Sequence, residues 1–195
     1  MKIKTVVLVL LIAVMATGLL SGCIFNESRY EKAVALLNEG ATSSDFKEAA
    51  EIFGKLGDYK DSTTLEADAR EKELIALQKM KIMVEAELEV TNCRLQLQLG
   101  NVAGAQKIFN SFSFMYEGWL ATDRDDMDEI TIELIDFTIE RYELGMCEMM
   151  YEMAIHSMEQ GNYGAAVTLF ERIRDINSDF KDSTEKLKEC YDKTN

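Results

Sequence analysis

Apolar residues recur at intervals of three and four along this chain, which is the spacing that places side chains on one face of an α-helix. The clearest such run is Ile132, Ile135, Ile139, Tyr142, Met146, Met149 and Met153. Leu95, Leu97 and Leu99 alternate with glutamines as in a strand, but the repeat described next favours a helix there. The pattern predicts helices over residues 28–39, 46–56, 62–99, 102–116, 125–160, 163–174 and 183–192. It leaves open whether each of the two long segments is one continuous helix.

One order of residue types occurs three times. It starts with a small residue, Ala33, Cys93 or Ala154, which lets two helices approach closely. Seven residues later comes a glycine, expected to end the first helix in the left-handed conformation: Gly40, Gly100 or Gly161. The second helix then repeats four core positions: Phe46, Val102 or Tyr163; Ala49, Ala105 or Ala166; Phe53, Phe109 or Phe170; and Leu56, Phe112 or Ile173. The pattern predicts three helical hairpins that stack on one another and form a binding surface rather than a catalytic pocket.

The third copy resembles the tetratricopeptide repeat (TPR), whose second helix opens with Gly-x-Tyr-x-x-Ala-x-x-x-Phe, here Gly161, Tyr163, Ala166 and Phe170. The copies recur about every sixty residues, against thirty-four in a regular array, so additional helix must follow each hairpin. The helix-closing Pro of the family is missing, since the chain contains no Pro. The resemblance implies an all-α fold of antiparallel hairpins, a TPR-like α-solenoid with two long helices, that binds proteins or peptides.

A second repeated string is Asp58-Tyr59-Lys60-Asp61-Ser62-Thr63, matched by Asp179-Phe180-Lys181-Asp182-Ser183-Thr184. Its Lys, Asp and Ser could form a catalytic cluster, but no His recurs with them. Asp and Ser are preferred residues at the start of a helix. We therefore expect the string to cap helices, through capping boxes that pair Asp182 with Glu185 or Thr63 with Glu66.

The N-terminus has the layout of a secretory signal. Lys2 and Lys4 precede an uncharged apolar run over residues 5–20, which is short for a membrane-spanning helix. The run ends in Leu20-Ser21-Gly22-Cys23, which resembles the lipobox of bacterial lipoproteins. The resemblance implies a signal peptide over 1–22, a lipidated Cys23 with a short linker to residue 28, and a TPR-like helical repeat domain over 29–195. An uncleaved anchor is the alternative, and either reading places the domain at the extracytoplasmic face of the cell membrane.

Net charge restricts the choice of partner. Without residues 1–22 the chain keeps 19 basic and 35 acidic residues, a net charge of −16. Such a surface argues against nucleic acid as a partner. It would suit a cationic protein, a peptide or metal ions, but an acidic surface that serves solubility alone is the preferred explanation.

Candidate chemistry is sparse. His156 is the only histidine, and we expect it to be a surface or packed residue. Cys93, Cys147 and Cys190 form no Cys-x-x-Cys pair and read as small core residues, although export would also permit a disulfide. The acidic residues of 123–129 fit a helix N-terminus better than a cation site. The sequence thus predicts no enzyme, no cofactor and no metal site.

The densest aromatic stretch is Phe109, Phe112, Phe114, Tyr116 and Trp119, which we expect to end at a turn at Gly118. Most of these side chains should pack between helices, whereas Tyr116 and Trp119 are candidates for binding a partner. The sequence therefore predicts a membrane-anchored lipoprotein that acts as a protein- or peptide-binding scaffold. A lipoprotein that binds a small molecule in a helical-core pocket is the alternative.

Overall fold

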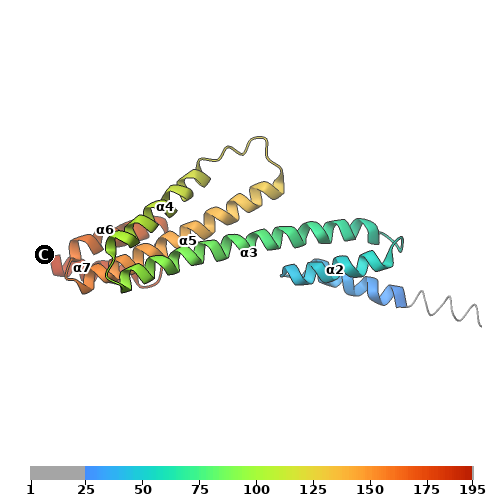
Figure 1. Ribbon diagram of the computed structural model, residues 1–195, viewed down its shortest axis with the longest axis horizontal. Helices are drawn as coiled ribbons and strands as arrows, with labels where there is room; N and C mark the ends of the chain where they lie inside the picture. Colours follow the sequence, from blue (N-terminus) through green and yellow to red (C-terminus); the bar gives the residue numbers. More distant parts are fainter. Residues whose placement is uncertain (1–24, 195) are drawn as a thin grey trace, which may run out of the picture. The chain divides into compact units, whose positions relative to one another are not determined.

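The structure, a computed structural model, describes residues 25–194, and this range consists of helices joined by short links, without strands. A first helix covers residues 25–39, and the remaining helices are α2 (Ser43–Leu56), α3 (Ser62–Gln98), α4 (Val102–Leu120), α5 (Glu129–Glu159), α6 (Tyr163–Ile176) and α7 (Ser183–Thr194). The predicted all-α fold of helical hairpins is confirmed (Figure 1). The predicted signal peptide, lipobox and Cys23 lie outside the described residues.

The two long segments are each one helix. α3 continues through Leu95 and Leu97, so the alternating leucines belong to a helix, as the repeat indicates. The predicted turn at Gly118 is wrong, because α4 continues to Leu120. A Cβ atom on Gly118 would meet no atom within 4 Å, so this glycine interrupts neither the packing nor the helix.

The chain divides into two compact units, and the boundary between Leu77 and Gln78 falls inside α3. The sequence pattern predicts one repeat domain over residues 29–195. In the first unit, the helix over 25–39, α2 and the first part of α3 enclose a small core. This core consists of Ala33, Leu37, Ala49, Ala50, Phe53, Leu56 and Ala69.

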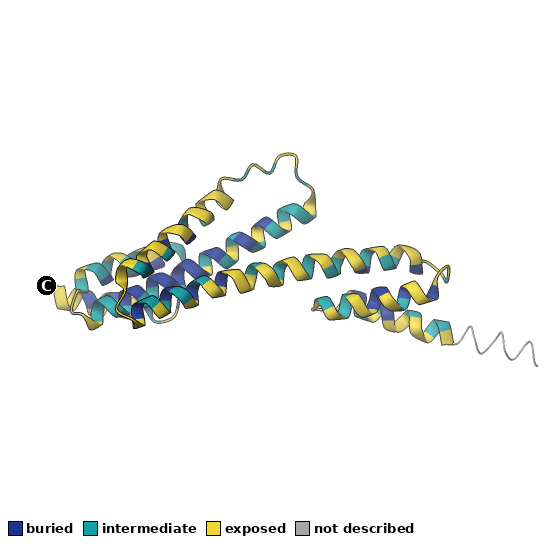
Figure 2. Cartoon of the chain, in the orientation of Figure 1, coloured by how far each residue is buried: buried dark blue, intermediate teal, exposed yellow. Residues whose placement is uncertain are grey.

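The second unit contains the rest of α3 together with α4, α5, α6 and α7. Most of its buried residues form one core cluster, to which all five of these helices contribute, and Figure 2 marks the buried positions along them. The largest that are fully buried are Phe112, Met149, Met150, Phe170 and Ile173. α3 and α5 run in the same direction here, since Lys79 pairs with Glu133 and, further along both helices, Arg94 pairs with Glu152.

The small repeat positions occupy the places where helices meet. Ala33, Cys93, Ala154, Ala49, Ala105 and Ala166 are all fully buried, and Phe53, Phe109 and Phe170 beside them are buried as well. Val102 departs from the pattern, since it is 47% exposed at the start of α4. Tyr163, at the same repeat position, packs against the core.

Two of the three repeat glycines end a helix in the left-handed region, with φ of 71° at Gly100 and 73° at Gly161. Asn101 and Asn162 follow as N-caps of the next helix. Gly40 does not adopt this conformation, and the prediction for it is wrong. A Cβ atom there would lie 2.2 Å from the carbonyl oxygen of Leu36, so glycine is required for close approach.

Candidate partner-binding site

The predicted anchor Trp119 lines a hollow of about 490 Å³ on the second unit. The hollow lies between α3, α5 and the loop that joins α4 to α5. Its walls are mainly apolar or hydroxyl-bearing, and the residues that carry them include Ile82, Thr122, Met127, Leu134 and Ile135. Trp119 is 38% exposed, so part of the indole remains available to a molecule in the hollow.

The second predicted anchor, Tyr116, does not line this hollow. It is half-buried and packs against the core of the second unit. Burial and the nearby Glu143 carboxylate raise the pKa of the Tyr116 hydroxyl, which donates to Glu143 Oε2 at 3.5 Å. Tyr116 therefore supports α4 from the inside, and Trp119 faces solvent.

The rest of the aromatic stretch divides in the same way. Phe109 and Phe112 are buried as expected, and Phe112 stacks on Tyr142 with ring centroids 4.4 Å apart. Phe114 is 77% exposed, so the expectation of packing between helices fails for it. At four-residue helical spacing Phe112 and Tyr116 face the core, and Phe114 points to the opposite side of α4.

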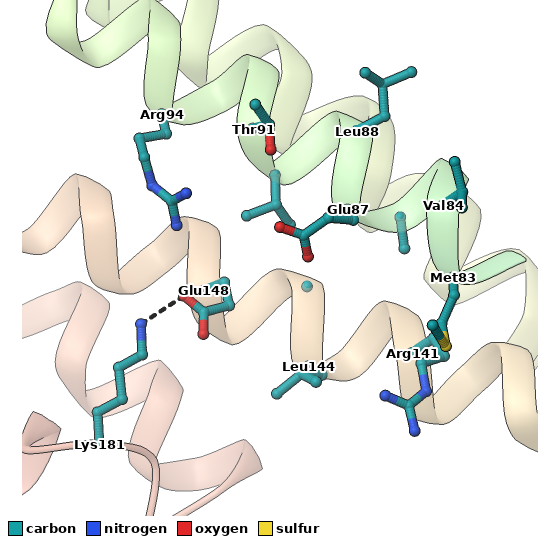
Figure 3. Close-up of a pocket in the computed structure, with 13 residues that line it drawn as sticks. Met83, Val84, Glu87, Leu88, Thr91, Arg94, Arg141, Leu144, Glu148 and Lys181 are labelled. Atoms are coloured by element: carbon teal, nitrogen blue, oxygen red, sulfur yellow. Dashed lines mark hydrogen bonds and ion pairs between the residues drawn. The ribbon is translucent and has the colours of Figure 1, made fainter. Parts of the chain in front are cut away.

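A second and larger hollow, which the sequence pattern did not predict, is a groove of about 680 Å³ between α3 and α5 (Figure 3). The apolar residues that line it include Met83, Val84, Leu88 and Val90 on α3 and Leu144 on α5. We call it the α3/α5 groove. Figure 3 shows the Glu87 carboxylate pointing from α3 toward α5, inside the groove.

A signal for this groove exists in the sequence. α3 carries a buried stripe at Ala86, Val90, Cys93 and Leu97, spaced by four, three and four. A second stripe with the same spacing, Val84, Leu88, Thr91 and Leu95, lies on another face, and all four residues are exposed. A helix that is apolar on two faces needs a partner on both, and the second stripe has none among the described residues.

Basic side chains from three elements surround the α3/α5 groove, and each has an acidic neighbour. Arg94 Nε lies 3.0 Å from Glu152 Oε1, and Arg141 Nη2 lies 3.3 Å from Glu140 Oε1. Lys181 Nζ lies 2.6 Å from Glu148 Oε2. Glu87 has no hydrogen-bond or ion-pair partner within the part of the chain that the structure describes. The groove therefore contains one uncompensated carboxylate.

The repeated string accounts for one of these pairs. In the first unit Lys60 Nζ bonds Glu27 at 2.6 Å and lies 4.4 Å from the ring centroid of Tyr30, whose hydroxyl donates to Asp61 at 2.6 Å. The second unit repeats this arrangement. There Lys181 bonds Glu148 at 2.6 Å and lies 4.7 Å from the centroid of Tyr151, whose hydroxyl donates to Asp182 at 2.5 Å.

The string therefore fastens the start of a helix onto an earlier helix. The capping box expected between Thr63 and Glu66 is wrong, because Thr63 donates to the carbonyl oxygen of Gly57 and Glu66 accepts from Arg70. The string does have the expected structural role, but through different contacts. Its Lys binds a Glu, and its second Asp accepts a hydrogen bond from a Tyr three residues after that Glu. A capping box does occur elsewhere, between Thr42 and Asp45 at the start of α2.

The remaining candidates for chemistry lie apart from both hollows. The thiols of Cys93, Cys147 and Cys190 are free and buried, and burial raises the pKa of Cys93 and of Cys147 to about 11. His156 is half-buried in the last turn of α5. Asp128 caps α5, and its hydrogen bonds from Thr131 lower its pKa.

Within residues 25–194 no three His, Cys, Asp or Glu side chains gather in a way that could hold a metal ion. None of the helices described is long and apolar enough to cross a membrane. No protein-family model matches the chain, and no curated protein or solved structure shows significant similarity to it.

Proposed function

We propose that this chain is a bacterial lipoprotein of the extracytoplasmic membrane face, whose TPR-like helical domain binds a protein or peptide. The lipid anchor is proposed from the Leu20-Ser21-Gly22-Cys23 motif and the charged, then apolar, segment before it. Two acyl chains would hold the protein at the membrane stably, where a single chain would bind only marginally.

The observation that carries the binding role is the hollow beside Trp119. An indole that is partly exposed at the rim of a hollow with apolar walls is typical of an anchor for a protein partner. Both hollows of the second unit are open to solvent, and this favours a polypeptide segment over a small molecule enclosed in the helical core. The indole of Trp119 can contribute to binding through its large apolar surface and its one N–H donor.

Site-specific photo-crosslinking in native membranes tests the binding role. A photoreactive residue replaces Thr122, which lines the hollow, in the full chain. We expect one reproducible protein adduct, which Trp119→Ala reduces by about tenfold, corresponding to the loss of roughly 1.4 kcal/mol. Phe114→Ala is the matched control, because Phe114 is exposed on α4 but lies outside the hollow. An adduct that survives Trp119→Ala, or none at all, would count against the site.

The anchor has a separate test. Replacing Cys23 with Ser removes the thiol that would carry the lipid, so we expect the wild type, and not this variant, to incorporate labelled palmitate. The apolar run over residues 5–20 remains in the variant and can hold it at the membrane, so palmitate incorporation and loss of residues 1–22 are the readouts. A wild type that incorporates no palmitate and keeps residues 1–22 would favour an uncleaved anchor instead.

A further inference from the structure

Glu87 occupies a repeat position whose other two members each bind a lysine. It precedes Cys93 by six residues, as Glu27 precedes Ala33 and Glu148 precedes Ala154. Glu27 binds Lys60, and Glu148 binds Lys181, each lysine being supplied by the repeated string. The middle repeat has no such string, so its glutamate lacks the lysine that the pattern provides elsewhere.

The reason lies in α4. This helix continues to Leu120, and the link that follows it, residues 121–128, contains neither a lysine nor an aromatic residue. Val90 replaces the tyrosine found at the same position in the other two copies, Tyr30 and Tyr151. In the other two copies the string places Tyr59-Lys60 or Phe180-Lys181 over the corresponding surface. The middle copy has no such pair, and the surface around Glu87 and Val90 is part of the α3/α5 groove.

The occupied and the vacant positions line the same groove. Figure 3 shows Lys181 bonded to Glu148 near one end and Glu87 unbonded further along. Leu88 and Leu144 line the same groove. Arg94 and Lys181 are paired with acids, and Arg141 contacts Glu140, although the buried Arg141 Nε has no hydrogen-bond partner among the described residues. Glu87 is the carboxylate of the groove that no described cation pairs. An incoming lysine would gain a charge-assisted hydrogen bond in a partly apolar setting, where such bonds are stronger than in water.

From this juxtaposition we infer that the α3/α5 groove binds a segment of a partner protein that carries a Lys or Arg next to an aromatic or large aliphatic residue. The cation bonds Glu87, and the apolar neighbour packs among Val84, Leu88 and Leu144. The segment thus reproduces, between two molecules, the contact that the repeated string makes within each unit. This assignment rests on the proposed role in binding a protein or peptide, and it specifies the chemistry of the partner.

A defined peptide tests the inference. The probe is the string of this chain itself, the acetylated and amidated peptide of residues 177–184, with its Phe180→Ala and Lys181→Glu versions as comparisons. The receptor is the full chain in detergent micelles with ¹³C-labelled methionine methyl groups. Met83 lines the α3/α5 groove and Met127 lines the hollow beside Trp119, so their two signals report the two sites separately.

We expect the unmodified peptide to shift the Met83 signal with a Kd of about 1 mM and to leave Met127 unchanged. Glu87→Gln should weaken this binding about tenfold, the effect of one charge-assisted hydrogen bond. Glu71→Gln is the matched control, because Glu71 is also exposed on α3 but lies outside the groove. The Lys181→Glu peptide should bind about tenfold more weakly than the original, and less weakly to Glu87→Gln than to the wild type, because that variant removes the repulsion between two glutamates. The Phe180→Ala peptide should also bind more weakly.

Two results would overturn the inference. One is the absence of any Met83 shift up to roughly 10 mM peptide, ten times the expected Kd. The other is equal or tighter binding of the Lys181→Glu peptide, which would mean that Arg94, Arg141 and Lys181 make the groove a site for acidic segments. Neither result affects the crosslink from Thr122, and loss of that crosslink does not affect the Met83 signal, so the proposed function and the lysine specificity fail separately.

Discussion

Gly145 of α5 lies so close to the ring of Phe112 that a Cβ atom on Gly145 would stand 2.7 Å from Phe112 Cζ and 3.4 Å from Val90 Cγ2. Three helices, α3, α4 and α5, meet at this point. The absence of a side chain at Gly145 sets how closely they approach and thereby the floor of the α3/α5 groove, which Val90 and Gly145 both line.

Gly145→Ala should therefore destabilise the protein even though alanine favours helices. Overpacking a core costs about 1–3 kcal/mol, and the gain in helix propensity offsets at most about 1 kcal/mol of it. We expect the free energy of unfolding, measured by urea denaturation, to fall by about 1–2 kcal/mol. Gly118→Ala is the control, since a Cβ there meets nothing within 4 Å, and it should raise stability by about 0.5–1 kcal/mol. A stabilising Gly145→Ala would contradict this close packing.

The Tyr151 hydroxyl should link stability to alkaline pH. Burial, together with the hydrogen bond to Asp182, raises the pKa of Tyr151 to about 12 from an ordinary value of 10.0. The folded state thus holds this proton more tightly than the unfolded state does. The resulting stabilisation is present in full below pH 10 and is lost as the pH rises through about 12.

Tyr151→Phe should remove that contribution. At pH 7 we expect a loss of about 1 kcal/mol in the free energy of unfolding, and a weaker fall in stability between pH 10 and pH 12 than in the wild type. Urea denaturation at each pH measures both effects. Tyr163→Phe serves as the control, because no hydrogen bond is formed by the Tyr163 hydroxyl within the described range. Identical pH profiles for wild type and Tyr151→Phe would contradict the assignment.

Ser62 and Ser183 are equivalent in the repeated string and both are buried, but their hydroxyl groups differ. Ser62 Oγ donates to the carbonyl oxygen of Tyr59 at 2.6 Å, whereas Ser183 Oγ has no hydrogen-bond partner among residues 25–194. Ser62→Ala should cost about 1 kcal/mol, and Ser183→Ala should be neutral or slightly stabilising because it removes an unpaired buried hydroxyl. Thermal unfolding of the two variants measures the difference. Equal losses would indicate that Ser183 has a partner in solution.

Cys93 and Cys147 should react slowly with thiol reagents. Both are buried, and their pKa values of about 11 leave little thiolate at pH 8. We expect labelling by a water-soluble disulfide reagent to be limited by opening of the second unit and to accelerate in urea. Labelling of the native protein at the rate of an unfolded control would contradict their burial.

Much of the fold could be predicted locally. Helix boundaries fell close to the structure wherever a cap or a glycine marks them, as at Gly100, Gly161 and Ser183, because capping depends on neighbouring residues alone. The turn predicted at Gly118 is wrong because a glycine by itself favours a helix end. Nothing in the local sequence shows that the flanking residues keep the helix intact as far as Leu120. The role of Trp119 at a hollow could be suspected from its place in an aromatic stretch, but Tyr116 could not be separated from it.

Periodicity and repeat order were enough to identify the helices, the small residues at their contacts and the two copies of the string, because these features follow from chemistry within a few residues. The α3/α5 groove, the unpaired Glu87 and the division of the chain at Leu77 required the folded molecule. They depend on which helices lie side by side and how closely, and that is set by contacts such as Gly145 with Phe112 between residues far apart in the chain.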